Sequence, residues 1–300
     1  MNENKTNINW YPGHMAKTKK QIIDDLKLID IVIEVLDSRC PLSTQNKDLE
    51  QELKNKKIIY AFNKSDLADD NETTKWMNYY KSKGNSCIKI QANESKGLKD
   101  LINTILNLYD NSKDLSQGKA QSNIKVMIIG IPNVGKSTLI NSLSNSNKAG
   151  VQNKPGFTKQ KQWIKIANGI NLLDEPGMLW PRLENEYVKR NLSFINAIPE
   201  NVVDNEEIAF YLLDFLCQNY KSNIEERYNI KIENLNTLQV KNLIASARGC
   251  ILRGAVIDEV KVANTIINDF RSGKLGKITL EKVEDIENIW WFNKEKWKWD

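Results

Sequence analysis

The sequence predicts an α/β domain with a mostly parallel sheet and helices on both faces, followed by a smaller all-helical domain. Strand-length apolar runs alternate with amphipathic stretches of helical length up to about residue 190, and only helical periodicity continues beyond it. Three hundred residues suit about two domains, and 40 % hydrophobic residues suffice for a core in each.

The alternating part holds strand-like and helix-like stretches in turn. We expect strands over 31–36, 57–62, 86–90, 124–130, 161–167 and 170–173. We expect helices over 44–55, 72–83, 97–110 and 136–144. This alternation favours parallel strand pairing with the helices covering the sheet.

Composition divides the chain further. A flexible N-terminal segment (1–22) precedes the α/β domain (23–185), and a helical domain (190–285) precedes a terminal tail (286–300). The polar, aperiodic stretch near 111–123 predicts a flexible linker inside the α/β domain. The tail is rich in tryptophan and lysine, so it either stacks on bases or a partner, or folds back onto the protein.

Charge and hydropathy limit the partners and the compartment. A net charge of +5 and the lysines clustered between 148 and 165 permit an RNA partner, although a solvated face is the alternative. No apolar run approaches the length of a membrane span, so we expect no membrane partner. The N-terminus lacks an apolar signal region and the four cysteines are scattered, which favours a reduced, cytoplasmic protein.

The segment GIPNVGKS (130–137) lies between a predicted strand and a predicted helix and matches GxxxxGK[ST]. In this motif backbone N–H groups surround phosphates, the lysine (Lys136) reaches the β and γ phosphates, and the hydroxyl of Ser137 binds Mg²⁺. The residues that we assign to phosphate binding are Asn133, Val134, Gly135, Lys136, Ser137 and Thr138.

The tetrapeptide Asn63, Lys64, Ser65, Asp66 follows a predicted strand and indicates which base is bound. Asn63 can reach guanine N7, the stem of Lys64 can lie across the ring, and Asp66 can accept from both N1–H and the 2-amino group. Adenine lacks this pair of donors, so the segment favours guanine. As an isolated tetrapeptide it is weak, because Asn and Asp are ordinary turn residues.

A second loop, at Gln91 and Ala92, follows the next predicted strand. We expect the Ala92 N–H to meet guanine O6, with Gln91 beside it. A plain connection between strand and helix is the alternative.

Downstream of the phosphate loop, the segment LLDEPG ends the last predicted strand. We expect Asp174 to hold Mg²⁺ through water, the Gly177 N–H to meet the γ phosphate, and Thr158 to sense the metal. Met178 follows, where many GTPases have a glutamine that orients the attacking water, and a thioether cannot do this.

These motifs occur in an unusual order. Along the chain they are the base reader (63–66), the base loop (91–93), the phosphate loop (130–138), the switch threonine (158) and the metal aspartate (174). In the common GTPase order the last three come first. If the segment with the last three motifs is moved from the start of the domain to its end, every contact is preserved, provided that the old termini are joined. The stretch near 111–123 supplies that join. We therefore expect a circularly permuted P-loop GTPase domain.

This order, with WYPGHMAK near the start and GIPNVGKSTLIN at the phosphate loop, resembles the circularly permuted GTPases of the ribosome biogenesis GTPase A family. The resemblance covers roughly residues 8–280 and includes DSRCP (37–41), DEPGMLWP (174–181) and RGC (248–250). The tryptophan-rich end departs from it.

The resemblance implies a GTPase with Mg²⁺ that binds the immature large (50S-type) ribosomal subunit late in its assembly, with the helical domain on ribosomal RNA and no DNA partner. Two alternatives stay open: a GTP-dependent RNA-binding scaffold with little hydrolysis, which Met178 favours, and a permuted GTPase of the small or an organellar subunit.

The resemblance also suggests three further roles. His14, the only histidine, is the candidate for positioning water, with a surface histidine as the alternative. Asn133 is the candidate ligand of a K⁺ ion near the phosphates, or it only caps the loop. Arg39 is either part of the site or an ordinary salt-bridge partner.

Overall fold

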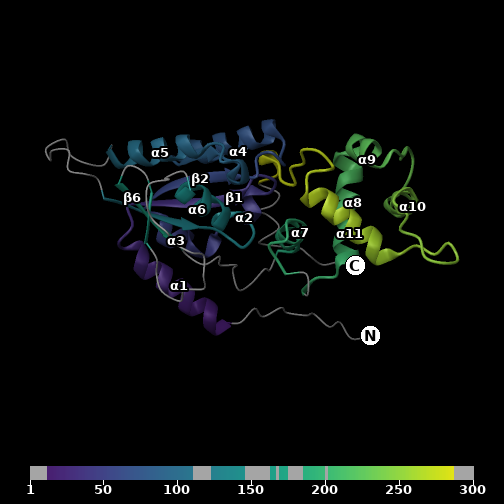
Figure 1. Cartoon of the computed structure of the whole chain (residues 1–300), viewed down its shortest axis with the longest axis horizontal. Coiled ribbons are helices and arrows are strands. Elements are labelled where there is room, and N and C mark those ends of the chain that lie inside the picture. Colours follow the sequence, from purple (N-terminus) through teal and green to yellow (C-terminus); the bar gives the residue numbers. More distant parts are fainter. Residues whose placement is uncertain are drawn as a thin grey trace.

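The computed structural model describes residues 12–110, 123–145, 163–166, 169–174, 185–199 and 202–286, and for 12–18, 145 and 174 it describes the backbone only. A six-stranded sheet in the order β3-β2-β1-β4-β6-β5 lies at the centre of its first part (Figure 1). The strands are β1 Ile31–Asp37, β2 Lys57–Asn63, β3 Ser86–Lys89, β4 Ile124–Ile129, β5 Trp163–Lys165 and β6 Ile170–Asp174. All neighbours pair in parallel except β5 and β6, which are antiparallel.

The first described strand, β1, is interior to the sheet. Ile31 of β1 pairs with Lys57 of β2 on one side and with Val126 of β4 on the other. An interior first strand is what the permuted motif order predicts. The register also brings Asp37 beside Asn63, so the ends of β1 and β2 lie together at the carboxyl edge of the sheet, where ligands bind in open parallel sheets.

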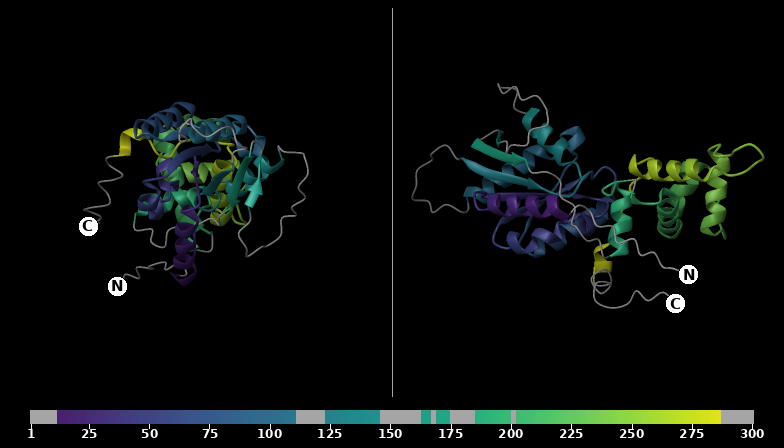
Figure 2. Two further views of the ribbon diagram at one scale, coloured as in Figure 1. Left: turned by 90° about the vertical axis from the view of Figure 1, so that its left-hand side faces the viewer. Right: turned by 90° about the horizontal axis from the view of Figure 1, so that it is seen from below.

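Helices cover both faces of the sheet (Figures 1 and 2). The helices of this part are α1 Pro12–Leu26, α2 Pro41–Thr44, α3 Glu50–Leu53, α4 Asp70–Ser82, α5 Leu98–Asp110 and α6 Lys136–Asn145, with 3₁₀ turns at Lys47–Leu49 and Ala92–Glu94. Alternate residues of each strand face opposite sides. Ile33 of β1 therefore packs with α5 and α6, whereas Val32 packs with α1 and α3. The mostly parallel α/β class is confirmed.

Two expectations about local structure are wrong. The helix expected over 44–55 is broken, because the Asn46 N–H donates to the Glu34 carboxylate at 2.5 Å and Gln45 is extended. Residues 12–22, expected within a flexible segment, form most of α1, because Ile22 and Leu26 are buried against the sheet. The other strand and helix predictions overlap the observed elements within a few residues.

The later helices lie at one end of the α/β domain (Figures 1 and 2). They are α7 Glu186–Phe194, α8 Asn205–Asn219, α9 Lys221–Tyr228, α10 Thr237–Ala247 and α11 Glu259–Arg271. Side-chain caps define several starts: Asp204 caps α8, Asn236 forms a capping box with Gln239 at α10, and Asp258 caps α11. Helix α7 contacts α2 of the α/β domain as well as α8 and α11 of the helical part, so it joins the two parts.

After α11 the chain returns to the α/β domain as the return segment, residues 277–286. The N–H of Ile278 donates to the Leu67 carbonyl at 3.0 Å, and the N–H of Leu280 donates to the Arg39 carbonyl at 2.7 Å. The Glu281 carboxylate is buried and accepts from the backbone N–H groups of Leu42 and Ser43 at 2.7 and 3.0 Å. The loops after β1 and β2 are therefore held by the end of the helical part.

Among the described helices, none is both long and apolar enough to span a membrane.

Candidate functional site: a guanine-nucleotide site at the carboxyl edge of the sheet

The phosphate loop joins β4 to α6 and requires glycine at Gly135. Its φ is +100°, and an added Cβ would lie 2.2 Å from the Asn63 side-chain nitrogen. Asn133 has a φ of +62°, the left-handed conformation that asparagine tolerates better than most residues. The loop thus packs closely against the end of β2, and a larger side chain at Gly135 would separate the two.

Lys136 begins α6 and already points along the loop. Its ammonium donates to the Gly130 and Ile131 carbonyls at 2.8 Å each, and the residue is 8 % exposed. Ser137 and Thr138, on the first turn of α6, are exposed. Free N–H groups at a helix start bind anions, so this geometry fits a phosphate chain that passes the exposed face of the loop.

Asn63 connects three loops. Its amide nitrogen donates to the Val134 carbonyl at 2.8 Å, and its amide oxygen accepts from the Ala92 N–H at 3.0 Å. Ser65 donates from its hydroxyl to the Ile90 carbonyl at 3.1 Å. The base reader, the base loop and the phosphate loop, which are distant in sequence, therefore meet at one point.

One detail of the base loop differs from expectation. The Ala92 N–H, expected to meet guanine O6, donates to Asn63 instead, since the Asn63 amide needs an acceptor and a donor partner to stay fixed between two loops. Gln91 forms a short antiparallel bridge with Lys96, with N···O distances of 3.1 and 3.2 Å, which closes the loop. In this structure Ala92 and Gln91 shape the base loop.

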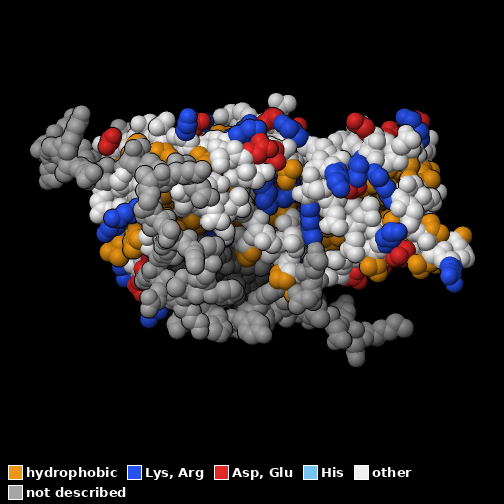
Figure 3. All heavy atoms as spheres, viewed as in Figure 1, with side chains coloured by type: hydrophobic (Ala, Val, Ile, Leu, Met, Phe, Trp, Pro, Cys, Tyr) orange, Lys and Arg blue, Asp and Glu red, His pale blue; other side chains and the backbone are white. Residues whose placement is uncertain are grey.

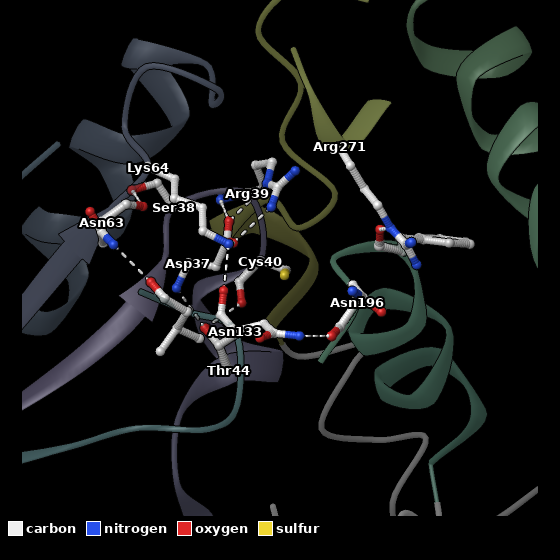
Figure 4. Close-up of polar contacts among 12 residues, drawn as sticks. Asp37, Ser38, Arg39, Cys40, Thr44, Asn63, Lys64, Asn133, Asn196 and Arg271 are labelled. Atoms are coloured by element: carbon white, nitrogen blue, oxygen red, sulfur yellow. Dashed lines mark hydrogen bonds and ion pairs between the residues drawn. The ribbon is translucent and has the colours of Figure 1, made fainter. Parts of the chain in front are cut away.

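Lys64 reaches from the base reader to the phosphate loop (Figure 4). Its ammonium donates to the Asn133 carbonyl at 2.6 Å and lies 3.0 Å from the Asp37 carboxylate. One carboxylate oxygen of Asp66, Oδ1, is buried and has no hydrogen-bond partner within the described part of the chain. A buried acceptor without a donor is costly, so the site fits a ligand that brings N–H groups to Asp66, as guanine does.

Asn133 also contacts the helical part. Its amide nitrogen donates to the carbonyl of Asn196, in the turn that follows α7 (Figure 4). This bond uses the nitrogen of the amide, whereas a cation would use its oxygen.

Several predicted site residues lie outside the described part of the chain: Thr158, Gly177 and Met178. Asp174 ends β6 beside Ile128 of β4, and its side chain is not described. His14 lies in the first turns of α1, where only the backbone is described.

Asp37 and Arg39 are the charged residues that sequence reasoning undervalued. Arg39 is 2 % exposed and donates from Nε and Nη2 to the two Asp37 oxygens at 2.9 and 2.8 Å. Burial alone raises the pKa of Asp37, but the positive charges of Arg39 and Lys64 hold it well below its usual range. A signal was present, because two opposite charges directly after an apolar strand must be paired if they are buried.

A parallel sheet whose carboxyl edge carries a phosphate loop and a guanine-type base reader, in permuted order, defines a circularly permuted P-loop GTPase. The family model described as "50S ribosome-binding GTPase" matches residues 125–245. The chain is 38 % identical to the ribosome biogenesis GTPase A of Bacillus cereus, over 94 % of this chain and 98 % of the relative. It is 30 % identical to the Thermotoga maritima protein of that name, over 94 % and 97 %.

Solved structures agree with these relatives. GNP-bound YlqF from T. maritima superposes with a TM-score of 0.60 at 26 % identity, covering 89 % of this chain and 98 % of that one. A GDP-bound TM YlqF gives a TM-score of 0.62 at 27 % identity, over 88 % of this chain and all of that one. The chain belongs to the ribosome biogenesis GTPase A family and is a GTPase, and the family resemblance of its motifs is confirmed.

Proposed function

We propose that this GTPase binds the immature large (50S-type) ribosomal subunit and its ribosomal RNA in a nucleotide-dependent way, late in subunit maturation in the cytoplasm. The family model and the relatives bear names of ribosome-binding and ribosome-biogenesis GTPases. The observation that carries the proposal is the position of the helical part, which contacts the phosphate loop at Asn133 and the base side through the return segment. A bound nucleotide and an RNA-bound helical part can therefore influence each other.

The charge on the helical part supports an RNA partner. On the face seen in Figure 3, Lys and Arg side chains lie at several places over this part. Two exposed lysines of the helical part, Lys231 and Lys274, lie 3.9 and 3.8 Å from the nearest carboxylate oxygens of Glu225 and Asp269. These lysines are exposed and sit far from their carboxylate partners, so each can turn to an RNA phosphate at little cost.

The nucleotide site that we propose unites residues of the three loops with Gly177, three positions after Asp174. It comprises Asn63, Lys64, Ser65, Asp66, Gln91, Ala92, Asn133, Val134, Gly135, Lys136, Ser137, Thr138 and Gly177. We assign Mg²⁺ to Ser137, Thr158 and Asp174, on the chemistry of their oxygen donors. The ion, when bound, neutralises charge on the β and γ phosphates, and Lys136 adds its own charge from the loop.

Hydrolysis needs a group that orients water, because Met178 cannot. We assign this role to His14, whose usual pKa near 6.5 suits proton transfer at neutral pH. Because His14 belongs to α1, we also propose that binding to the ribosome sets the position of this helix. His14→Ala should keep nucleotide affinity and lose the stimulated part of GTP turnover, measured as phosphate release with large subunits present. Wild-type stimulated turnover in that variant would reject the role.

A K⁺ ion at Asn133 is part of the same proposal, since positive charge near the bridging oxygens can partly replace an arginine finger. The bond from the Asn133 nitrogen to Asn196 orients the amide without using its oxygen. We expect turnover to fall when Na⁺ replaces K⁺, and Asn133→Ala to remove that difference. Equal turnover of the wild-type protein in both salts would rule the ion out.

The decisive experiment is sedimentation of the protein with purified large or small subunits in GDP, GTP and a non-hydrolysable GTP analogue. We expect co-sedimentation with large subunits in the GTP forms and release in GDP. Equal binding in all three nucleotide states, without stimulated GTP turnover in K⁺ buffer, would favour the second candidate function, an RNA-binding scaffold. We keep this candidate because Met178 stands where many GTPases have a glutamine. Preference for small subunits, or for organellar ones, would overturn the choice of partner.

A further inference from the structure

We propose that Asp37 and Arg39 are positioning residues for Lys64, and that Arg39 makes guanine-nucleotide affinity depend on the docking of α11. This inference rests on the proposed nucleotide site, because Lys64 is assigned there to the guanine ring. It adds two residues outside the nucleotide-binding loops and a route from the helical part to the base.

The first step is the orientation of the Asp37 carboxylate. Its Oδ1 accepts from the Arg39 Nε at 2.9 Å and from the Arg39 backbone N–H at 3.1 Å. Its Oδ2 accepts from Arg39 Nη2 at 2.8 Å and lies 3.0 Å from the Lys64 ammonium. The guanidinium thus fixes the plane of the carboxylate, and a single lysine could not supply the same two-point contact.

The second step is the effect on Lys64. A free lysine side chain samples many rotamers, and each would place its stem differently over a base. Here the Asp37 carboxylate on one side and the Asn133 carbonyl on the other hold the ammonium at 3.0 and 2.6 Å (Figure 4). Because Asp37 is fully buried and stays ionised, this restraint persists at neutral pH. The stem is therefore held in place before the nucleotide arrives, which lowers the cost of binding.

The third step connects Arg39 to the helical part. The centre of its guanidinium lies 5.0 Å from the ring centroid of Phe270 in α11, within cation–π range. Its carbonyl accepts from the Leu280 N–H of the return segment at 2.7 Å. Arg39 is thus held by the helical part on two sides.

Arg271, the residue after Phe270, contacts the end of α7, which leads to the phosphate loop. Arg271 donates to the carbonyls of Phe194 and Ser193 at 3.0 and 2.9 Å, at the end of α7. The following turn carries Asn196, whose carbonyl accepts from Asn133 of the phosphate loop (Figure 4). The end of α11 therefore contacts the base side through Phe270 and the phosphate side through Arg271, so a displacement of α11 changes both.

The chain contains a matched control for the ion pair. Asp269, also in α11, accepts from the Nε and Nη2 of Arg227 at 2.9 and 3.0 Å, and Lys274 lies 3.8 Å away. This cluster has the same composition as the one at Asp37: a carboxylate, an arginine that donates to both of its oxygens, and a lysine. None of its three residues belongs to the loops of the nucleotide site.

The test compares Asp37→Asn with Asp269→Asn in the full chain, by titration with fluorescent GDP. We expect Asp37→Asn to weaken GDP binding about tenfold, which is less than the full contribution of a charged hydrogen bond. We expect Asp269→Asn to change GDP affinity less than about twofold. In a Lys64→Met background the effect of Asp37→Asn should vanish, because a residue that acts through Lys64 has nothing left to position. Additive effects of Asp37→Asn and Lys64→Met, or equal effects of the two aspartate variants, would overturn the positioning role.

The link to α11 is tested with Phe270→Leu, and Ile267→Ala in the same helix is its control. Both residues are buried, so both variants should lower the melting temperature. Only Phe270→Leu should also weaken GDP binding, by about threefold, as expected for one lost cation–π contact. Equal GDP affinity of the two variants would remove the link.

Failure of this inference can be told from failure of the proposed site. If the wild-type protein binds GDP and discriminates against ADP, but Asp37→Asn changes nothing, only the positioning role is lost. If the wild-type protein shows no preference for guanine, the proposed site fails first.

Discussion

Side chains build the base half of the proposed nucleotide site, whereas the backbone builds the phosphate half. On the base side, Asn63 joins the loops through its amide, and the buried Asp37 carboxylate holds Arg39 and Lys64. On the phosphate side, glycine conformations shape the loop, and Lys136 is bonded to the loop's own carbonyls.

This difference separates the two tasks of the site. A triphosphate carries dense charge without a unique pattern of donors and acceptors, so N–H groups and a lysine suffice to bind it. A base must be distinguished from other bases by specific donors and acceptors, which needs side chains in fixed positions. Changes in the phosphate half should therefore affect turnover, and changes in the base half should affect selectivity.

The largest effect is expected for Lys136→Ala. The variant removes the positive charge that stabilises the transferring phosphoryl group, so GTP turnover should fall about 100-fold or more. The measurement is phosphate release at saturating GTP, with Lys27→Ala as control, since the exposed Lys27 side chain pairs with Asp24, three positions earlier in the sequence. Turnover near the wild-type rate in Lys136→Ala would contradict the assignment of the phosphate half.

A smaller effect is expected at the junction of the two halves. Gly135→Ala places a Cβ 2.2 Å from the Asn63 amide, whereas Gly84, with a φ of +83°, has open space at this position. Gly84→Ala should cost about 1–2 kcal/mol in free energy of unfolding from its backbone conformation alone. Gly135→Ala should cost about 1–3 kcal/mol more and should also weaken GDP binding, because Asn63 must move.

The check is urea unfolding of both variants together with GDP titration. Equal losses in stability, with GDP affinity intact in Gly135→Ala, would show that the two halves do not meet at Asn63.

The smallest effect concerns a buried acid beneath the base half. Glu34 in β1 is fully buried, and among the residues that the structure describes no cation pairs with it and its Oε2 has no hydrogen-bond partner. Burial raises its pKa to about 8. Asp37, three residues later on the same strand, has two cations and a lowered pKa, so the strand carries one neutral and one ionised carboxyl group.

The pH dependence follows from the sign of the Glu34 shift. Below about pH 4.5 the Glu34 carboxyl group is protonated in both the folded and the unfolded chain, and the fold keeps its full stability. As the pH rises from there towards 8, the unfolded chain releases this proton while the folded chain keeps it, so the free energy of unfolding falls. Glu34→Gln keeps the shape without the charge, so it should raise the free energy of unfolding at pH 7 by about 1–3 kcal/mol and flatten its decline between pH 5 and 8. GDP affinity should not change. A variant less stable than wild type at pH 7 would contradict this interpretation.

The sequence predicts the strands well, because their apolar runs are short, uniform and separated by clear helical periods. It also predicts the permuted order, since each loop motif carries its own local signal. The contacts between the α/β domain and the helical part had no such signal. Asn133 and Asn196 meet across more than sixty positions, and the bond involves a backbone carbonyl that any residue could supply.

The charged residues were harder to interpret than the motifs. In the sequence, Arg39 is simply an arginine that follows a strand. Its burial and its contact with Phe270, which the structure shows, distinguish the Arg39–Asp37 pair from a surface ion pair. The broken helix after β1 has a similar cause, because the Asn46 N–H bonds to a carboxylate twelve positions earlier and leaves the helical pattern. Tertiary contacts overrode local preference in both cases.

The central claim is that this chain reads guanine through a segment that precedes its phosphate loop, and Asp66→Asn tests it most directly. Xanthine has a carbonyl where guanine has the 2-amino group, so an amide at position 66 should favour xanthosine triphosphate over GTP. Competition binding of the two nucleotides to the wild-type and variant proteins should show preference shifting by about 100-fold or more. Unchanged GTP affinity in Asp66→Asn, with no gain for xanthosine triphosphate, would contradict the account.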